Sequence, residues 1–105
     1  KMTCKDSLVS LLNELISLFE NGNRLVYTRL ILLRHHVRNQ LDDKIIQDAC
    51  RMFYLNNVSD FNAKDINMFK STTYFTNIEI IWSELSLANR SRVWLWIDAI
   101  VNDLI

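Results

Sequence analysis

The chain has 105 residues, of which half are apolar and 23% are charged, and this composition excludes an intrinsically disordered chain. Its 12 basic and 12 acidic residues cancel, so net charge selects no class of partner. The absence of proline and the single glycine, Gly22, favour helices joined by short polar turns over a many-turned β-sandwich. We therefore predict an all-α fold: a compact bundle of five or six helices, with residues 1–105 forming a single domain.

The first two predicted helices cover residues 7–20 and 24–39. Asp6 or Ser7 can accept the free amides at the first helix start, and the segment 21–23 supplies a glycine stop. Apolar residues at three-and-four spacing form its broad stripe: Leu8, Leu11, Leu12, Leu15, Ile16, Leu18 and Phe19. The second helix places these residues on one line: Val26, Leu30, Leu33 and Val37, with Ile31 and Leu32 widening it.

The third predicted helix opens with Leu41, Asp42 and Asp43 and runs to the region of Leu55, because acidic residues suit the positive end of a helix. Its expected buried face consists of Ile45, Ile46, Ala49, Cys50, Met52 and Phe53. A turn at 56–59 precedes a short fourth helix over 60–69 and a loop at 70–74. The strand-like composition of residues 73–76 leaves a short extended piece as an alternative.

Two further helices complete the prediction. A capping box starts the first of them, with the Thr76 hydroxyl and the Glu79 carboxylate each accepting a free amide. Its apolar face contains Ile78, Ile81, Trp82 and Leu85. Ser86 caps the last helix, whose apolar positions are Val93, Trp94, Ile97, Ile100, Val101 and Leu104. The apolar faces predict that Trp82 and Trp94 anchor a helical hairpin in the core.

Trp96 differs from the other two tryptophans. It sits about 200° around the last helix from Trp94, on the flank that carries Arg92 and Asn89. One interpretation is a partly covered rim residue. The other is an interface anchor, because exposed tryptophans concentrate binding energy. Trp96 and Arg92 are therefore the predicted partner-binding residues.

Three segments carry a resemblance to a known group of proteins. The C-terminal pattern comprises Ile81-Trp82, Leu85-Ser86, Asn89-Arg90, Val93-Trp94 and Trp96-Ile97; the others are LNELISLF at 12–19 and FNAKDINMF at 61–69. Together they resemble small, mostly uncharacterised helical proteins of large nucleocytoplasmic DNA viruses, with Ile66 and Met68 departing from the usual pattern. The resemblance implies a helical fold and a viral source, and it brings no activity with it.

The polar pairs have structural explanations. His35 and His36 point about 100° apart on a helix and cannot share a metal ion, so solvent-facing or rim positions are the favoured interpretation. Asp42 and Asp43 suit a helix start. A buried lysine or aspartate in Lys64-Asp65 would suit catalysis, whereas a capping or arginine-paired aspartate is structural, with Arg51 or Arg90 as the partner; we favour structure. No phosphate loop, nucleophile elbow or zinc spacing occurs, so we expect no enzyme activity and no cofactor.

The helix over 24–39 carries four arginines and no acidic residue: Arg24, Arg29, Arg34 and Arg38. They form a candidate phosphate footprint, although the favoured interpretation pairs them with acidic residues of neighbouring helices.

Cys4 lies in a polar N-terminal segment and Cys50 in an apolar one, and we expect Cys50 to be a buried free thiol in a reducing compartment. No apolar run reaches the roughly 18 to 20 residues of a membrane span, and the N-terminus lacks the pattern of a signal peptide. We expect the cytoplasm of a host cell or a virion.

The sequence therefore predicts a non-catalytic viral module for protein–protein interaction or assembly, including self-association. The alternative is nucleic-acid binding through the basic helix. Mimicry of a host death-pathway helical domain would rest on fold analogy alone.

Overall fold

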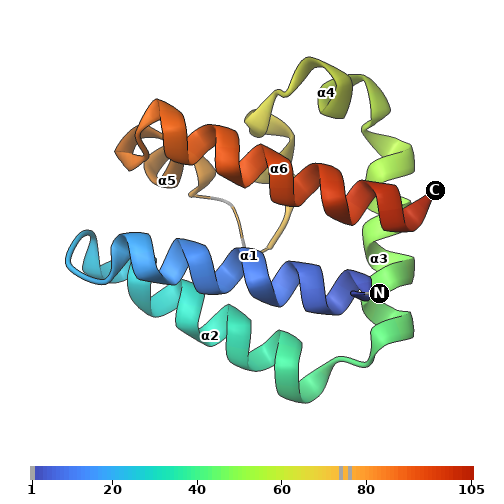
Figure 1. Ribbon diagram of the computed structural model, residues 1–105, viewed down its shortest axis with the longest axis horizontal. Coiled ribbons are helices and arrows are strands. Elements are labelled where there is room, and N and C mark those ends of the chain that lie inside the picture. The colour runs from blue at the N-terminus through green and yellow to red at the C-terminus, as the bar shows by residue number, and fades with distance from the viewer. Residues whose placement is uncertain (1, 74, 76) are drawn as a thin grey trace.

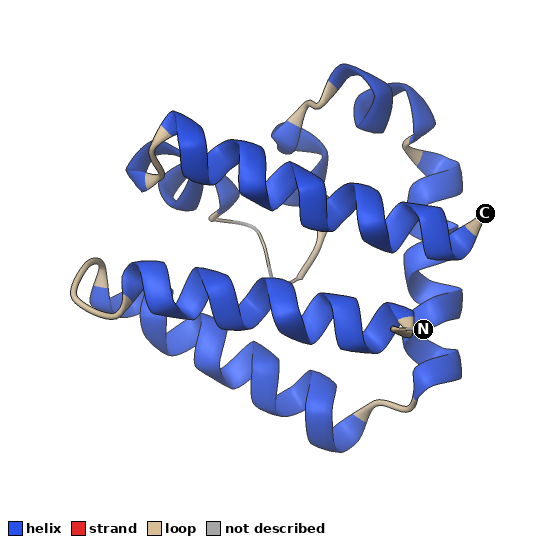
Figure 2. Ribbon diagram, in the orientation of Figure 1, coloured by secondary structure: helices blue, strands red, loops and turns tan. Residues whose placement is uncertain are grey.

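The computed structural model describes residues 2–73, 75 and 77–105. Within this part of the chain the structure consists of helices and connecting turns, without β-strands, which confirms the predicted all-α fold class (Figures 1 and 2). The elements in chain order are α1 (Cys4–Phe19), α2 (Arg24–Gln40), α3 (Asp43–Asn56), α4 (Val58–Ala63), the 3-10 helix η1 (Ile66–Ser71), α5 (Ile78–Glu84) and α6 (Leu87–Leu104). The radius of gyration is 13.1 Å, as for a compact domain of this size.

Helix α1 occupies the middle of the fold. It lies between α2 and α6, and α3 runs across the ends of these helices (Figure 1). A helix with neighbours on several sides can bury apolar side chains around much of its circumference. Seven residues of α1 are buried: Cys4, Ser7, Leu11, Leu12, Leu15, Ile16 and Phe19.

Helix α1 begins at Cys4, earlier than the predicted start at residue 7. Thr3 is the N-cap, and its Oγ1 accepts the amide of Asp6 at 3.1 Å. The Asp6 carboxylate in turn accepts the amide of Thr3 at 3.2 Å, which completes a capping box. The prediction of Asp6 or Ser7 as the cap was therefore wrong, because Thr3 offers the hydroxyl and Asp6 the reciprocal acceptor. This earlier start makes Cys4 a helical residue.

Helix α2 buries the predicted line of Val26, Leu30, Leu33 and Val37. Leu32 does not widen that line, because its side chain is 63% exposed on the outer side of the helix. The cap at the start of α2 is Asn23, whose Oδ1 accepts the amide of Val26 at 3.1 Å.

Helix α3 departs most from the prediction. Only Ile46 of the six expected core residues is fully buried, and Cys50 and Phe53 are half-buried. Ile45, Ala49 and Met52 are exposed, because α3 lies at one end of the fold and meets its neighbours along one side. That inner side packs on aromatic rings that follow it in the chain: Phe53 lies 5.9 Å from Phe61 and 5.5 Å from Phe69, between ring centroids.

The predicted single helix over 60–69 is broken into α4 and η1. Lys64 adopts a left-handed conformation with φ of 54°, which ends α4. The Asp65 side chain then accepts the amide of Asn67 at 3.0 Å and starts η1. An aspartate that caps a new helix start competes with continuation of the previous helix, which explains the break.

Between η1 and α6, several predictions concern residues that the structure leaves undescribed. Tyr74 and Thr76 lie outside the described part, so the capping box at Thr76 and the extended piece stay predictions. Among their described neighbours, Thr73 and Phe75 are not in a strand. Helix α5 begins after Asn77, one residue past the predicted cap.

The C-terminal helix follows the prediction closely. Ser86 caps α6, with its Oγ accepting the amide of Asn89 at 3.1 Å. Trp94 is buried and Trp82 is half-buried, and their rings meet edge to face with centroids 6.0 Å apart. The pair therefore joins α5 to α6 as predicted, but Trp94 alone of the two is a core residue.

Candidate functional site

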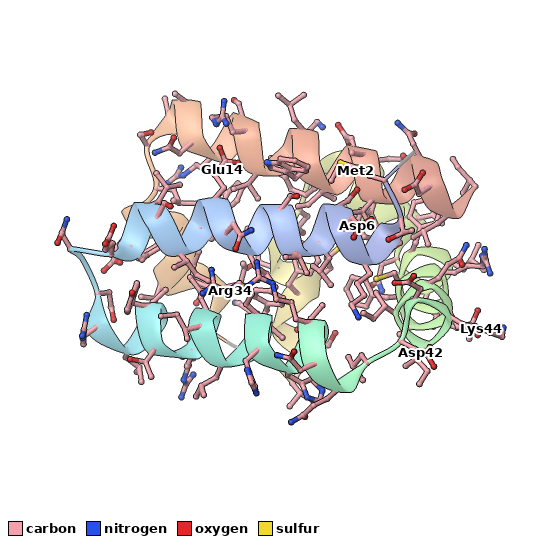
Figure 3. The ribbon with its side chains drawn as sticks, turned by 60° about the horizontal axis from the view of Figure 1, so that its bottom comes forward. Met2, Asp6, Glu14, Arg34, Asp42 and Lys44 are labelled. Atoms are coloured by element: carbon pink, nitrogen blue, oxygen red, sulfur yellow. The ribbon has the colours of Figure 1, made fainter. Side chains whose placement is uncertain are left out.

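Trp96 is held against α1 by a carboxylate. Its indole N–H donates to Oε2 of Glu14 at 2.6 Å, and Arg92 forms an ion pair with Oε1 of the same side chain. Figure 3 shows Glu14 between α1 and α6. Trp94 and Trp96 therefore lie on opposite flanks of the buried stripe of α6, and Trp96 is half-buried. The structure thus brings the two predicted partner-binding residues together and adds Glu14 to them.

An open hollow of about 310 Å³ lies beside this indole, and we call it the Trp96 hollow; its lining is Arg92, Leu95, Trp96 and Ala99. Leu95 is 68% exposed. Glu14 was not among the residues predicted from the sequence. The available signal was an acidic residue inside the apolar run of α1, because a partly buried indole N–H needs an acceptor. Trp96 is a preorganised aromatic surface, and its role in binding stays a prediction.

A second exposed surface lies on α3, and we call it the α3 stripe; it consists of Ile45, Ala49, Met52 and Leu55. The side chains of Ile45, Met52 and Leu55 are 53%, 60% and 58% exposed. Ile45, Ala49 and Met52 follow three-and-four spacing, so they form one line along the helix. A contiguous exposed apolar row is the usual mark of an interaction surface. Ile45, Ala49 and Met52 were predicted to be core residues, and that prediction is wrong because they face solvent.

Charges of both signs flank the α3 stripe and form ion pairs with one another. Asp48 accepts an ion pair from Lys44 at 3.1 Å and another from Arg51 at 3.7 Å. Such exposed pairs contribute little to stability. Two cations and one carboxylate leave this flank with one net positive charge.

The four arginines of α2 are not gathered on one face. Arg24, Arg29 and Arg38 are exposed, whereas Arg34 is half-buried and donates to Oδ1 of Asn13 at 2.8 Å (Figure 3). The expected pairing with acidic residues is wrong within the described residues, where none of the four makes an ion pair. An amide replaces the expected acid because Asn13 is the residue that α1 presents to Arg34.

The other polar candidates have local structural roles. Asp42 caps α3 by accepting the amide of Ile45 at 2.8 Å. Lys64 lies 3.6 Å from an Asp98 oxygen and 5.2 Å from the Trp94 ring centroid. Asp65 caps η1, so the capping interpretation is confirmed. The predicted arginine partners are engaged elsewhere: Arg51 pairs with Asp48, and Arg90 donates to the carbonyl of Trp82 at 3.0 Å.

The two histidines make separate hydrogen bonds within α2. His35 bonds with Asn39 and His36 with Gln40, each one helical turn further along α2. His35 is exposed and His36 is half-buried, in agreement with the solvent-facing or rim interpretation. In the described residues, no group of three histidine, cysteine or acidic side chains is placed to bind a metal ion.

The two cysteines are free thiols. Cys4 is buried, with 5% exposure, and Cys50 is half-buried. The more buried thiol is therefore Cys4 and not Cys50, because α1 starts early enough to carry Cys4 against α3. The Cys4 thiol hydrogen-bonds to Cys50 and thereby lowers the pKa of Cys50, although burial opposes this effect. The same hydrogen bond raises the pKa of Cys4, and burial raises it further.

In comparisons with protein-family models, with curated proteins and with solved structures, nothing matches the chain. Over the described residues, the structure contains no helix with the length and apolar character needed to cross a bilayer. The geometry of its surfaces is therefore the basis for a functional proposal.

Proposed function

We propose that the chain is a non-catalytic protein–protein interaction and assembly module, and that the α3 stripe is its main binding surface. The uncovered apolar row on α3 carries this proposal. Ile45, Met52 and Leu55 are exposed to water, and burying them under a partner makes binding more favourable. The polar candidates support a non-catalytic role through what they already do. Asp42 and Asp65 cap helices, and Glu14 holds Trp96.

The partner that the stripe fits best is a second copy of the same chain. In an antiparallel pairing of two α3 helices about a two-fold axis, Ile45 of one copy meets Met52 of the other, and the two Ala49 residues meet at the centre. A small residue at the centre lets the helices approach, while the larger residues fill the two ends. The flank of Lys44, Asp48 and Arg51 carries both signs of charge, so each copy offers an acidic and a basic group to the other.

The resemblance to helical proteins of large DNA viruses supports assignment to a viral assembly or a host-directed complex, in the cytoplasm of a host cell or in the virion. A single helical row such as the α3 stripe forms a small interface, and small interfaces give weak homodimers unless neighbouring residues extend them. We therefore expect association in the micromolar to millimolar range.

Sedimentation velocity over a range of protein concentrations tests the proposal. We expect the wild type to form dimers as concentration rises, and Met52→Lys to weaken the dimer by about tenfold or more, because a charge would be buried in the interface. Leu32→Lys is the matched control, since Leu32 is 63% exposed and also lies in the middle of a helix. A wild type that stays monomeric throughout, or equal effects of both variants, contradicts the proposal.

The same measurement compares the two surfaces. If association uses the Trp96 hollow, Leu95→Lys weakens it and Met52→Lys does not. Leu95 is the residue to replace because it lines the Trp96 hollow. It is 68% exposed, so its replacement leaves the core intact.

Nucleic-acid binding through α2 is the second candidate. The observation that favours it is the exposure of Arg24, Arg29 and Arg38 without an ion pair among the described residues. It predicts binding to duplex or single-stranded nucleic acid that falls steeply with salt and is lost when these three residues become glutamine. Arg34 is left unchanged because it supports α1. Binding that does not change with salt rejects this candidate.

A further inference from the structure

The chain has three methionines, and they differ in how far they are open to water. Met52 is 60% exposed, Met2 is 45% exposed and Met68 is 7% exposed. A thioether is oxidised only when its sulfur meets the oxidant, so exposure decides which methionine reacts. Met52 is therefore the methionine most open to oxidants, whereas Met68 of η1 is shielded within the core.

Met52 belongs to the α3 stripe, between Ala49 and Leu55 and one helical turn from each. This stripe lies on α3 at the end of the fold (Figure 1). In the proposed antiparallel pairing, Met52 of one copy packs against Ile45 of the other, and two-fold symmetry repeats that contact in each dimer. The flexible, apolar thioether suits such a contact.

Oxidation would change Met52 at the atom that the pairing covers. Methionine sulfoxide carries a polar oxygen on the sulfur, and burying this oxygen without a hydrogen bond disfavours binding. The side chain of Ile45, which would face it, has no hydrogen-bond donor. One oxidised residue per chain places two sulfoxides in each dimer.

We propose that Met52 is an oxidation switch for the α3 stripe: a small hydroperoxide converts its thioether to the sulfoxide, and the associated chains separate. The switch rests on the proposed function, because it acts on a dimer in which Met52 is covered. It adds to that function a modification site and the chemical class of the oxidant.

The reaction transfers one oxygen atom. The Met52 sulfur attacks one oxygen of the hydroperoxide with a lone pair, so that an S–O bond forms while the O–O bond breaks. The proton on the transferred oxygen passes to the departing oxygen, which leaves as water when the oxidant is hydrogen peroxide. The sulfur loses two electrons and the peroxide gains two. Methionine sulfoxide reductases reverse this oxidation, which makes the switch reversible.

Association also decides when Met52 reacts. The residue is open in the monomer and covered in the proposed dimer, so peroxide oxidises the monomer and then keeps it from pairing. Met2 is the internal reference. It lines an open hollow with Asp43 and Gln47, which project from a different side of α3 than the stripe.

Peptide mass spectrometry after brief exposure of the full chain to excess hydrogen peroxide measures the sulfoxide at each methionine. At low protein concentration, we expect Met52 to gain about 16 Da at least roughly tenfold faster than Met68. At a concentration where about four-fifths of the chains are dimeric, the reaction of Met52 should slow about fivefold and that of Met2 should not change. Faster reaction of Met68 than of Met52, or no protection of Met52 in the dimer, contradicts the proposal.

Sedimentation velocity of the same samples measures the effect on association. The oxidised wild type should dimerise about tenfold more weakly than the reduced chain, and a methionine sulfoxide reductase should restore the dimer. Met52→Leu should dimerise like the wild type and lose its sensitivity to peroxide, since leucine keeps an apolar side chain of similar volume without sulfur. This variant retains both cysteines, so any effect of peroxide on the thiols is common to both chains. Met2→Leu should stay sensitive.

The outcomes separate the switch from the proposed function. A wild type that stays monomeric before oxidation overturns both. A wild type that dimerises equally well before and after oxidation of Met52 overturns the switch alone, as does a Met52→Leu variant that peroxide still dissociates.

Discussion

Helices α1 and α3 have similar apolar content but differ in how many of their residues are buried. Helix α1 buries seven residues, and α3 fully buries Ile46 alone. The difference lies in the neighbours: α1 has α2 and α6 on its two sides and α3 across its end, whereas α3 forms the end of the fold. The comparison teaches that an apolar stripe becomes core only where another element covers it, and otherwise it is available to a partner.

The largest expected contrast between the two helices comes from truncation of one large side chain in each. Leu12→Ala removes a side chain with 0% exposure and should lower the free energy of unfolding by about 3 to 5 kcal/mol. Met52→Ala, at 60% exposure, should cost less than about 1 kcal/mol. Urea unfolding of both variants measures the difference. Equal losses would show that α3 is covered on both sides in solution.

Helix α6 repeats the contrast within one element. Trp94→Ala should cost about 3 to 5 kcal/mol, because it leaves a large cavity between α5 and α6. Trp96→Ala should cost about 1 to 2 kcal/mol, since Trp96 is half-buried and Glu14 keeps its ion pair with Arg92. Trp96→Phe, which retains the ring and removes the N–H, separates packing from the hydrogen bond. A Trp96→Ala loss as large as that of Trp94→Ala would assign Trp96 to the core.

The smallest contrast is expected at the helix caps, which act locally in both elements. Thr3→Ala in α1 and Asp42→Ala in α3 each remove one cap hydrogen bond and should each cost about 1 kcal/mol. Thermal unfolding of the two variants, with Thr3→Ser and Asp42→Asn as cap-retaining controls, checks this. A much larger cost at Thr3 would show that the first turn of α1 also supports the packing of Cys4.

The α3 stripe and the Trp96 hollow show why sequence reasoning reached only part of the candidate site. Trp96 and Arg92 were accessible to it, because helix geometry turns them away from Trp94. Glu14 was not, since its contact with Trp96 joins residues far apart in the chain. Ile45 and Met52 were assigned to the core because periodicity shows which residues share a face without showing which faces meet.

Local chemistry in the sequence determined the helices themselves: the all-α class, the apolar lines of α1, α2 and α6, and the Ser86 and Asp42 caps. These depend on spacing and on side chains within a few residues of one another. The tertiary structure alone decided that Cys4 is buried, that Glu14 holds both Trp96 and Arg92, and that one apolar line of α3 stays exposed. Such contacts depend on how helices pack across the chain, and packing follows from the combined shape of all their faces.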